Sequence, residues 1–290
     1  MPRADANPWP ARRVLTYAHQ CGAWEAPSST LFALRRALDL GVTGIELDVH
    51  ATADRHLVVC HDGTVDRTTD GHGPIHSLTL AEVRALDNAY WFVPGGDETQ
   101  GLAPEDYPYR GRAPADRTFG VATLAEVLEV LDDHPDVALN LDIKQTAPAV
   151  ESYEELLATE LARHRHTDRV IVASFLDVAT QRFAAVAPDI AVSAGTIGTA
   201  TFWRALQEGE DPPAPDYVAL QVPRAQGDVV IVDERFVTAA HALGVAVHVW
   251  TVNDVPTMRH LLDLGVDGII SDLPTPLVAM VAGLGLTYRP

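Results

Sequence analysis

Short apolar runs rich in β-branched residues alternate with longer helical patterns along the whole chain. The runs predict eight strands, at residues 14–19, 44–50, 137–143, 169–174, 189–194, 216–222, 245–250 and 267–271. The helical patterns lie near residues 29–40, 122–133, 151–165, 177–187, 200–208, 233–243, 254–264 and 275–283. Strands that alternate with helices form a parallel sheet, and eight strand–helix pairs favour its closure into a (β/α)8 barrel. We therefore predict an α/β fold, a TIM barrel, as a single domain over residues 1–290.

Three segments of similar sequence support a barrel made of repeated units. Residues 37–48 read ALDLGVTGIELD, residues 261–272 read LLDLGVDGIISD, and residues 241–250, HALGVAVHVW, are a looser third copy. Each reads as the end of a helix, a glycine at which the chain leaves that helix, and a strand. At the start of the first helix, Ser28 or Ser29 is expected as the N-cap.

Residues 62–120 interrupt the alternation and are too long for a plain loop in a compact domain. The capping box Thr79-x-x-Glu82 predicts a helix within residues 77–87. Six aromatic residues lie among the glycines and prolines of this segment: Tyr90, Trp91, Phe92, Tyr107, Tyr109 and Phe119. We predict an inserted cap over one mouth of the barrel, in which most of these aromatic side chains pack against one another.

Composition excludes some classes of partner and compartment. The formal net charge of −19 leaves no surplus of cations to bind a nucleic acid backbone, although a small anion can bind where a metal ion reverses the local field. The first 13 residues lack an apolar run and are not expected to be a signal peptide, and no stretch reaches the roughly 20 apolar residues of a membrane span. Only Cys21 and Cys60 are present, and their pairing is left open; so few cysteines predict a cytoplasmic location.

Acidic side chains share faces of two predicted strands. Glu46 and Asp48 are two residues apart in an apolar strand, and Asn140 and Asp142 alternate in the same way. The carboxyl ends of barrel strands meet at the active-site mouth, so these carboxylates form an oxygen-rich site suited to one divalent cation, Mg²⁺ or Ca²⁺. Salt bridges to arginines at the barrel rim are the weaker interpretation. Lys144 follows closely and is the only lysine among 21 basic residues. Compositional chance and a position that requires a compact ammonium explain this equally well.

Two histidines are placed where proton transfer is expected. His19 ends the first strand, and His61 ends the extended run LVVCHD just after the acidic strand. Imidazole titrates near neutral pH, so two histidines beside an acidic cluster predict a general acid and a general base. Among the other histidines only His50 and His248 have a comparable setting, and His248 is expected to line the pocket because it shares a strand face with Trp250.

Five sequence blocks together resemble the glycerophosphodiester phosphodiesterase family, within the superfamily of phosphatidylinositol-phosphodiesterase-like TIM barrels. These blocks are GIELDVHAT, LVVCHDGTVDRTTDG, LNLDIK, VWTVND and GVDGIISDLP, and the resemblance runs from about residue 17 to residue 274. It implies a (β/α)8 barrel with an insertion after the second strand, which fits residues 62–120. It also implies a set of roles: Glu46, Asp48 and Asp142 as metal ligands, His19 and His61 as the acid/base pair, Lys144 near the substrate phosphate, and Trp250 as an aromatic wall of the glycerol pocket.

The first motif departs from the family pattern. The family usually has His-Arg-Gly followed by Pro-Glu-Asn-Thr, whereas this chain has His19-Gln20-Cys21 and, at the same offset, residues 27–30 read PSST. Gln20 thus stands where an arginine is expected to bind phosphate, and Ser28 stands where a glutamate is expected. Losing a charged hydrogen bond to phosphate costs about 1.5–3 kcal/mol, so Gln20 is a candidate substrate contact whose effect the sequence does not fix.

The family resemblance implies metal-dependent hydrolysis of glycerophosphodiesters to glycerol 3-phosphate and an alcohol, by attack of a glycerol hydroxyl through a cyclic phosphate. One alternative is a lysophospholipase D-like enzyme that uses the aromatic residues of 62–120 for an acyl chain. A second is a barrel that binds phosphodiesters with weak or no turnover, given the changed first motif. A metal-dependent aldolase or sugar isomerase would explain the carboxylates but not the histidine pair. Contact with a lipid surface and the oligomeric state stay open.

Overall fold

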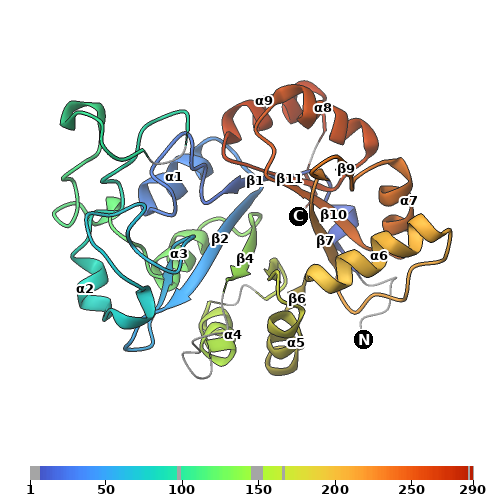
Figure 1. Cartoon of the computed structure of the whole chain (residues 1–290), viewed down its shortest axis with the longest axis horizontal. Helices are drawn as coiled ribbons and strands as arrows, with labels where there is room; N and C mark the ends of the chain where they lie inside the picture. The colour runs from blue at the N-terminus through green and yellow to red at the C-terminus, as the bar shows by residue number, and fades with distance from the viewer. Residues whose placement is uncertain (1–6, 97–98, 145–152, 165–166, 287, 290) are drawn as a thin grey trace.

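Eight parallel strands form the centre of the molecule. The structure is a computed structural model that describes residues 7–96, 99–144, 153–164, 167–286 and 288–289. The strands are β1 (Leu15–His19), β2 (Gly44–Ala51), β4 (Ala138–Ile143), β5 (Val170–Ala173), β6 (Ala191–Val192), β7 (Ala219–Pro223), β10 (Ala246–Trp250) and β11 (Gly268–Ser271). Their order is β6-β5-β4-β2-β1-β11-β10-β7, and β3 (Leu57–Val59) adds antiparallel to β2. Ser193, directly after β6, forms a parallel bridge with Ala219 of β7, so the barrel is nearly closed (Figure 1).

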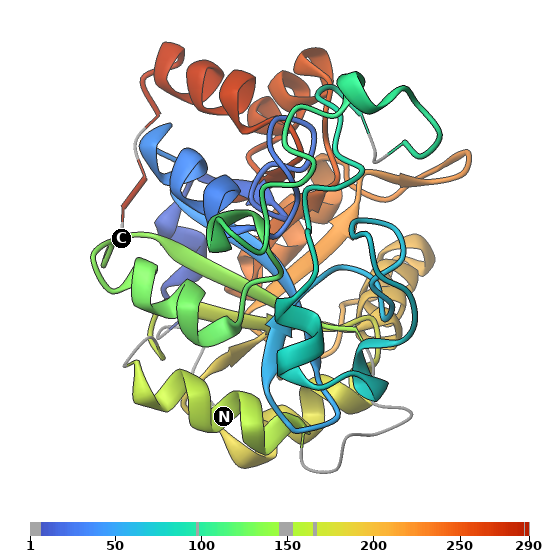
Figure 2. The ribbon, with the colours of Figure 1, turned by 90° about the vertical axis from the view of Figure 1, so that its left-hand side faces the viewer.

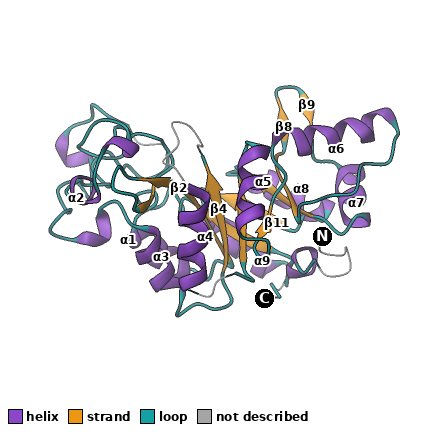
Figure 3. Ribbon diagram, turned by 90° about the horizontal axis from the view of Figure 1, so that it is seen from below, coloured by secondary structure: helices purple, strands orange, loops and turns teal. Residues whose placement is uncertain are grey.

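Helices surround this barrel (Figures 1 and 3). They are α1 (Leu31–Asp39), α3 (Leu124–Leu131), α4 (Tyr153–Arg163), α5 (Asp177–Val186), α6 (Thr196–Glu208), α7 (Glu234–Ala242), α8 (Val255–Leu264) and α9 (Pro274–Gly283), with the short hairpin strands β8 (Ala225–Gln226) and β9 (Val229–Val230) after β7. The predicted α/β fold and all eight predicted strand–helix pairs are confirmed. The helix predicted at 200–208 begins earlier, at Thr196, and the ends of the helix predicted at 151–165 lie outside the described residues. Among the described residues, no helix is long and apolar enough to cross a membrane.

The start of α1 corrects one prediction. Its N-cap is Thr30, whose Oγ1 accepts a hydrogen bond of 3.1 Å from the backbone N–H of Ala33. Ser28 or Ser29 was expected there, but Ser29 has a φ of 57°, and its N–H donates to the carbonyl of Gln20. The left-handed turn therefore delays the helix until Thr30, where such a cap contributes about 1 kcal/mol.

The first glycine of each repeated segment lies where the chain leaves a helix, as predicted. Gly41, Gly244 and Gly265 follow α1, α7 and α8 with φ values of 82°, 69° and 92°. Positive φ lets the chain leave a helix and costs a glycine little, because it has no Cβ. The turns at all three copies are thus confirmed.

The segments 37–48 and 261–272 each contain a second glycine, Gly44 and Gly268, and both lie beside the ring of Tyr17 inside the barrel. Tyr17 is fully buried on β1, between β2 and β11. A Cβ at Gly44 would lie 2.4 Å from Cδ1 of Tyr17, and a Cβ at Gly268 would lie 3.1 Å from its Cε2. The repeat therefore places a glycine on each side of one large ring.

Replacing Gly44 with Ala is expected to lower the free energy of unfolding by about 1–3 kcal/mol, because the added methyl group overpacks the ring of Tyr17. Denaturant unfolding followed by circular dichroism measures this change. Gly96→Ala is the matched control, because a Cβ there meets nothing within 4 Å, and it should change stability by less than about 0.5 kcal/mol. Equal stability of the two variants would contradict this account of the barrel interior.

Residues 62–120 lie on the side of the molecule that carries α1 and α3 (Figures 1 and 2). They contain η3 (Ile75–Ser77), α2 (Leu80–Arg84), η4 (Pro104–Asp106) and η5 (Arg117–Phe119), and the predicted capping box at Thr79 is present. Residues 97–98 lie outside the described part. The rings of Tyr109 and Phe119 stack with centroids 5.2 Å apart, and the guanidinium of Arg110 lies 3.6 Å from the ring centre of Tyr107. The prediction that these aromatic side chains pack against one another is confirmed.

Candidate active site

A cavity of about 560 Å³ lies at the carboxyl ends of the barrel strands. Six of the residues predicted from the sequence line it: His19, Glu46, His61, Asp142, Lys144 and Trp250. They come from β1, β2, β4 and β10 and from the residues directly after β3 and β4, so segments far apart in the sequence meet at one mouth. The structure therefore brings most of the predicted site together.

Three carboxylates lie buried beside one another at this mouth. Glu46 and Asp48 extend from the same face of β2, and Asp142 stands opposite Asp48 on β4. Their exposed fractions are only 5%, 0% and 9%. Burial and the neighbouring charge of Asp48 raise the pKa of Glu46 to about 8, and burial also raises the pKa of Asp142. Such a cluster is electrostatically costly unless cations lie close to it.

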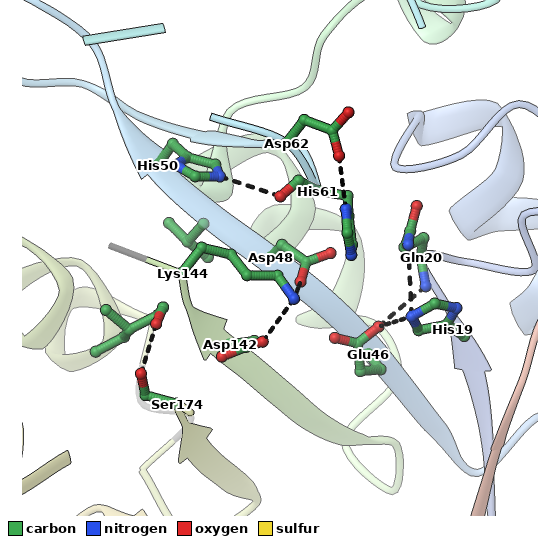
Figure 4. A network of polar contacts seen from close by, with 12 residues as sticks. His19, Gln20, Glu46, Asp48, His50, His61, Asp62, Asp142, Lys144 and Ser174 are labelled. Carbon is green, nitrogen blue, oxygen red and sulfur yellow. Dashed lines mark hydrogen bonds and ion pairs between the residues drawn. The ribbon is translucent and has the colours of Figure 1, made fainter. Parts of the chain in front are cut away.

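Lys144 supplies one of these cations. Its Nζ lies 2.9 Å from Oδ1 of Asp48 and 2.8 Å from Oδ2 of Asp142 (Figure 4). Burial lowers the pKa of Lys144, but the two carboxylates outweigh burial and raise it above the ordinary value. The chain's only lysine is therefore held as a charged ammonium at the acidic cluster.

The predicted metal ligands are close together, although they are not arranged around one point. Within the described residues, no three His, Cys, Asp or Glu side chains are placed to hold a metal ion, and the ammonium of Lys144 lies between two of the three predicted ligands. Oδ2 of Asp48 and Oδ1 of Asp142 are nevertheless buried without a hydrogen-bond partner. Buried carboxylate oxygens that lack donors fit a hard cation, and the ligand role stays a prediction.

His19 is anchored through one ring nitrogen. Its Nδ1 lies 2.5 Å from Oδ1 of Asp272, and Oδ2 of Asp272 accepts a 2.7 Å hydrogen bond from the amide of Asn253. Its Nε2 lies 3.7 Å from Oε2 of Glu46. Burial lowers the pKa of His19, but the charges of Glu46 and Asp272 outweigh burial and raise it to about 9.

His61 is anchored in the same way, next to His19. Its Nδ1 lies 2.7 Å from Oδ1 of Asp62, whose other oxygen accepts a 2.8 Å hydrogen bond from Arg67. The hydrogen bond from His61 lowers the pKa of Asp62. The ring centres of His19 and His61 are 6.4 Å apart at an angle of 79°. Because an aspartate holds each Nδ1, proton exchange with a ligand falls to the Nε2 atoms. Figure 4 shows the contact of Asp62 with His61 and the 3.7 Å contact of Nε2 of His19 with Glu46.

These anchoring residues were missing from the sequence-based assignment. Asp62 directly follows His61 and lies in a quoted block, so its adjacency was a usable signal. Asp272 directly follows β11, and it reaches His19 only because β11 pairs with β1 in the barrel. Asn253 holds Asp272 from the loop after β10.

Two polar residues predicted from the sequence to lie at the pocket, His248 and Gln20, are buried. His248 was expected to line the pocket, but it is fully buried next to Tyr17 and is not among the cavity-lining residues of the described chain. It shares a face with Trp250 but lies two residues nearer the start of β10, which places it one layer deeper, and burial lowers its pKa to about 3. Gln20 is also buried: its N–H donates to Glu46, and its Nε2 lies 3.4 Å from Nε2 of His19. A contact of Gln20 with substrate stays a prediction.

The two cysteines are buried free thiols. Burial raises the pKa of Cys60 to about 12, so it remains protonated near neutral pH. In this structure, therefore, Cys21 and Cys60 do not pair.

Comparison with known proteins gives one consistent family. A model of the Glycerophosphoryl diester phosphodiesterase family matches residues 19–275. A glycerophosphodiester phosphodiesterase of Caldanaerobacter subterraneus subsp. tengcongensis is 31% identical over 270 residues, which cover 93% of this chain and 98% of the relative. The fold is also similar to two solved structures. A glycerophosphodiester phosphodiesterase from Agrobacterium tumefaciens has a TM-score of 0.68 at 22% identity, covering 92% of this chain and 99% of its own. An Oleispira antarctica phosphodiesterase in complex with the product sn-glycerol-3-phosphate has a TM-score of 0.70 at 24% identity, covering 94% and 98%.

Proposed function

Since the chain belongs to the glycerophosphoryl diester phosphodiesterase family, we propose that it hydrolyses glycerophosphodiesters to glycerol 3-phosphate and an alcohol. The observation that carries this proposal is the pair of histidines, each anchored at Nδ1 by an aspartate, beside a lysine and three buried carboxylates in one cavity. The Oleispira phosphodiesterase binds the glycerol phosphate that such a reaction would release.

The two histidines move the protons. One Nε2 accepts the proton of a glycerol hydroxyl as its oxygen attacks phosphorus, while the other protonates the alkoxide that leaves, so the P–O bond to the alcohol breaks as a cyclic phosphate forms. Water then opens the cyclic phosphate with the two roles exchanged. His19 and His61 lie next to each other at one end of the acidic cluster (Figure 4), with ring centres 6.4 Å apart, which suits a phosphodiester that contacts both rings.

Glu46, Asp48 and Asp142 are proposed to hold one divalent cation, Mg²⁺ or Ca²⁺. Their buried, unpartnered oxygens fit such an ion. When bound, the ion would neutralise negative charge on the phosphoryl oxygens. Lys144, the one Lys or Arg among the described residues that line the cavity, would bind the phosphate, and Trp250 would form an aromatic wall for glycerol.

The remaining assignments rest on the sequence. We propose that residues 1–290 form a single domain, that 62–120 is an insertion after the second strand that acts as a cap, and that the protein is cytoplasmic. Its partner is a small phosphodiester, and the net charge of −19 argues against nucleic acid.

Incubation with glycerophosphocholine, glycerophosphoethanolamine and glycerophosphoglycerol tests the activity. We expect equimolar glycerol 3-phosphate and alcohol, measured by coupled dehydrogenase assay and chromatography, and no release of inorganic phosphate from glycerol 3-phosphate. Binding of these compounds without turnover, in the presence of Mg²⁺ or Ca²⁺, would contradict the proposal and favour a phosphodiester-binding barrel.

A further inference from the structure

The cavity has two halves of different chemistry. The histidines, carboxylates and Lys144 occupy one half. The other half is lined by Phe175 after β5, Trp203 on α6, Ile231 after β9, and Trp250 at the end of β10. Among the described residues, the acidic side chains that line the cavity are Glu46 and Asp142, and both belong to the first half. Apart from the proposed contact of glycerol with Trp250, a bare glycerophosphodiester is polar and gives Phe175, Trp203 and Ile231 little to bind.

The apolar lining continues out of the cavity onto the surface. Phe175 lines the cavity and is also 53% exposed, Ile197 is 71% exposed, and Val230 is 51% exposed. Six of the nine exposed large apolar side chains in the described residues follow β5, β6 and β7: Phe175, Leu176, Val178, Ile197, Val229 and Val230. Figure 3 shows the β8–β9 hairpin beside α6 at this edge. Clustered exposed apolar side chains mark a binding surface more often than scattered ones do.

We propose that this strip, from Trp203 and Ile231 inside the cavity to Ile197 and Val230 outside, is a subsite for a hydrocarbon chain attached to the phosphodiester. The substrate class is then a phosphodiester with one acyl or alkyl chain, such as a lysophospholipid. The proposal rests on the proposed function, because the reacting phosphate must lie between His19 and His61.

Two other occupants fit the strip less well. A quaternary ammonium headgroup would favour the aromatic rings, but Nζ of Lys144 already lies 5.6 Å from the ring centre of Phe175 and would repel a second cation. A folded partner protein would cover the outer residues but would not reach Trp203 and Ile231 in the cavity. A single hydrocarbon chain contacts both parts of the strip.

The strip also replaces the aromatic insertion as the place for an acyl chain. The rings of Tyr90, Trp91 and Tyr107 surround the guanidinium of Arg110 at 4.3, 4.6 and 3.6 Å, and in the described residues none of the 62–120 segment lines the cavity. The aromatic residues of that cluster are close together in the chain and are visible in the sequence, whereas the strip is assembled from segments far apart in the chain: the residues after β5, helix α6 and the β8–β9 hairpin.

The test compares glycerophosphocholine with hexanoyl, octanoyl, decanoyl and dodecanoyl lysophosphatidylcholine, each below its aggregation concentration. For the wild type, kcat/KM should rise by about two- to fourfold for each methylene that enters the strip. Ile231→Asn and Ile197→Asn should each lower kcat/KM for the dodecanoyl substrate, Ile231→Asn by about tenfold, with glycerophosphocholine turnover within about twofold of wild type. Val186→Asn is the matched control, because Val186 is 44% exposed at the other end of α5.

Binding of dodecylphosphocholine, followed by tryptophan fluorescence, gives a readout that does not depend on turnover. A Kd that tightens with chain length and weakens in Ile231→Asn supports the subsite, even if no substrate is hydrolysed and the proposed function fails. Chain-length-independent turnover and binding, with glycerophosphocholine still hydrolysed, would overturn the subsite and leave the proposed function standing.

Discussion

Replacing His61 with Ala is expected to lower kcat for glycerophosphocholine by about 10²–10⁴-fold. The loss follows from geometry, because Asp62 holds Nδ1 of His61 at 2.7 Å and leaves Nε2 for proton exchange. His19→Ala should lose a similar factor, since His19 is anchored in the same way by Asp272. Because both rings act in one proton exchange, the double variant should lose far less than the product of the two single losses.

Steady-state kinetics with the metal-loaded enzyme measures this effect. His72→Ala is the control, because the His72 side chain is 87% exposed and its Nδ1 lies 3.3 Å from Oδ1 of Asp66 on the surface, and its kcat should match wild type. Thermal unfolding of each variant separates a catalytic loss from a folding loss. A His19 or His61 variant that is folded and keeps more than about half of the wild-type kcat would refute the acid/base assignment.

The histidine and carboxylate positions could be predicted from sequence because they depend on local geometry. Glu46 and Asp48 share a face because a strand alternates its side chains, and His19 reaches the mouth because it ends a strand. The alternation of strands and helices fixes the barrel in the same way. Even Gly41 and Gly265 follow from where a helix must end.

Features that depend on contacts between distant segments could not be predicted in this way. The N-cap of α1 moves to Thr30 because Ser29 turns toward the carbonyl of Gln20. Asp272 becomes the partner of His19 only once β11 lies beside β1. His248 and Trp250 share a face, but the depth of each in the barrel depends on how all the strands are staggered.

Composition singled out Lys144 but did not predict its ion-pair partners. Its rarity marked it as unusual, and the resemblance placed it near phosphate. Neither showed that its ammonium lies between Asp48 and Asp142. That position makes Lys144 part of the charge balance of the acidic cluster as well as a candidate phosphate contact.

Removal of divalent metal by a chelator is expected to abolish turnover, and Asp48→Asn is expected to lower kcat by more than about 10²-fold at saturating Mg²⁺ or Ca²⁺. Asp48 is fully buried, and its Oδ2 has no hydrogen-bond partner. The amide keeps the shape of the side chain but removes the charge that a cation requires. Undiminished activity after complete metal removal would refute this part of the mechanism.

Unfolding measurements test the same site without activity. An ion that binds only the folded chain at 100 times its Kd raises the free energy of unfolding by about 2.7 kcal/mol, so added Mg²⁺ or Ca²⁺ should stabilise the wild type but not Asp48→Asn. Asp263→Asn is the control, because the Asp263 side chain is 62% exposed, and it should keep the full metal-dependent shift. Without metal, Asp48→Asn should be about as stable as wild type: it loses an ion pair with Lys144, but it also removes a charge that repels Glu46. A variant that loses both activity and the metal-dependent shift while remaining folded would assign Asp48 to the metal site, whereas an unchanged shift would exclude it.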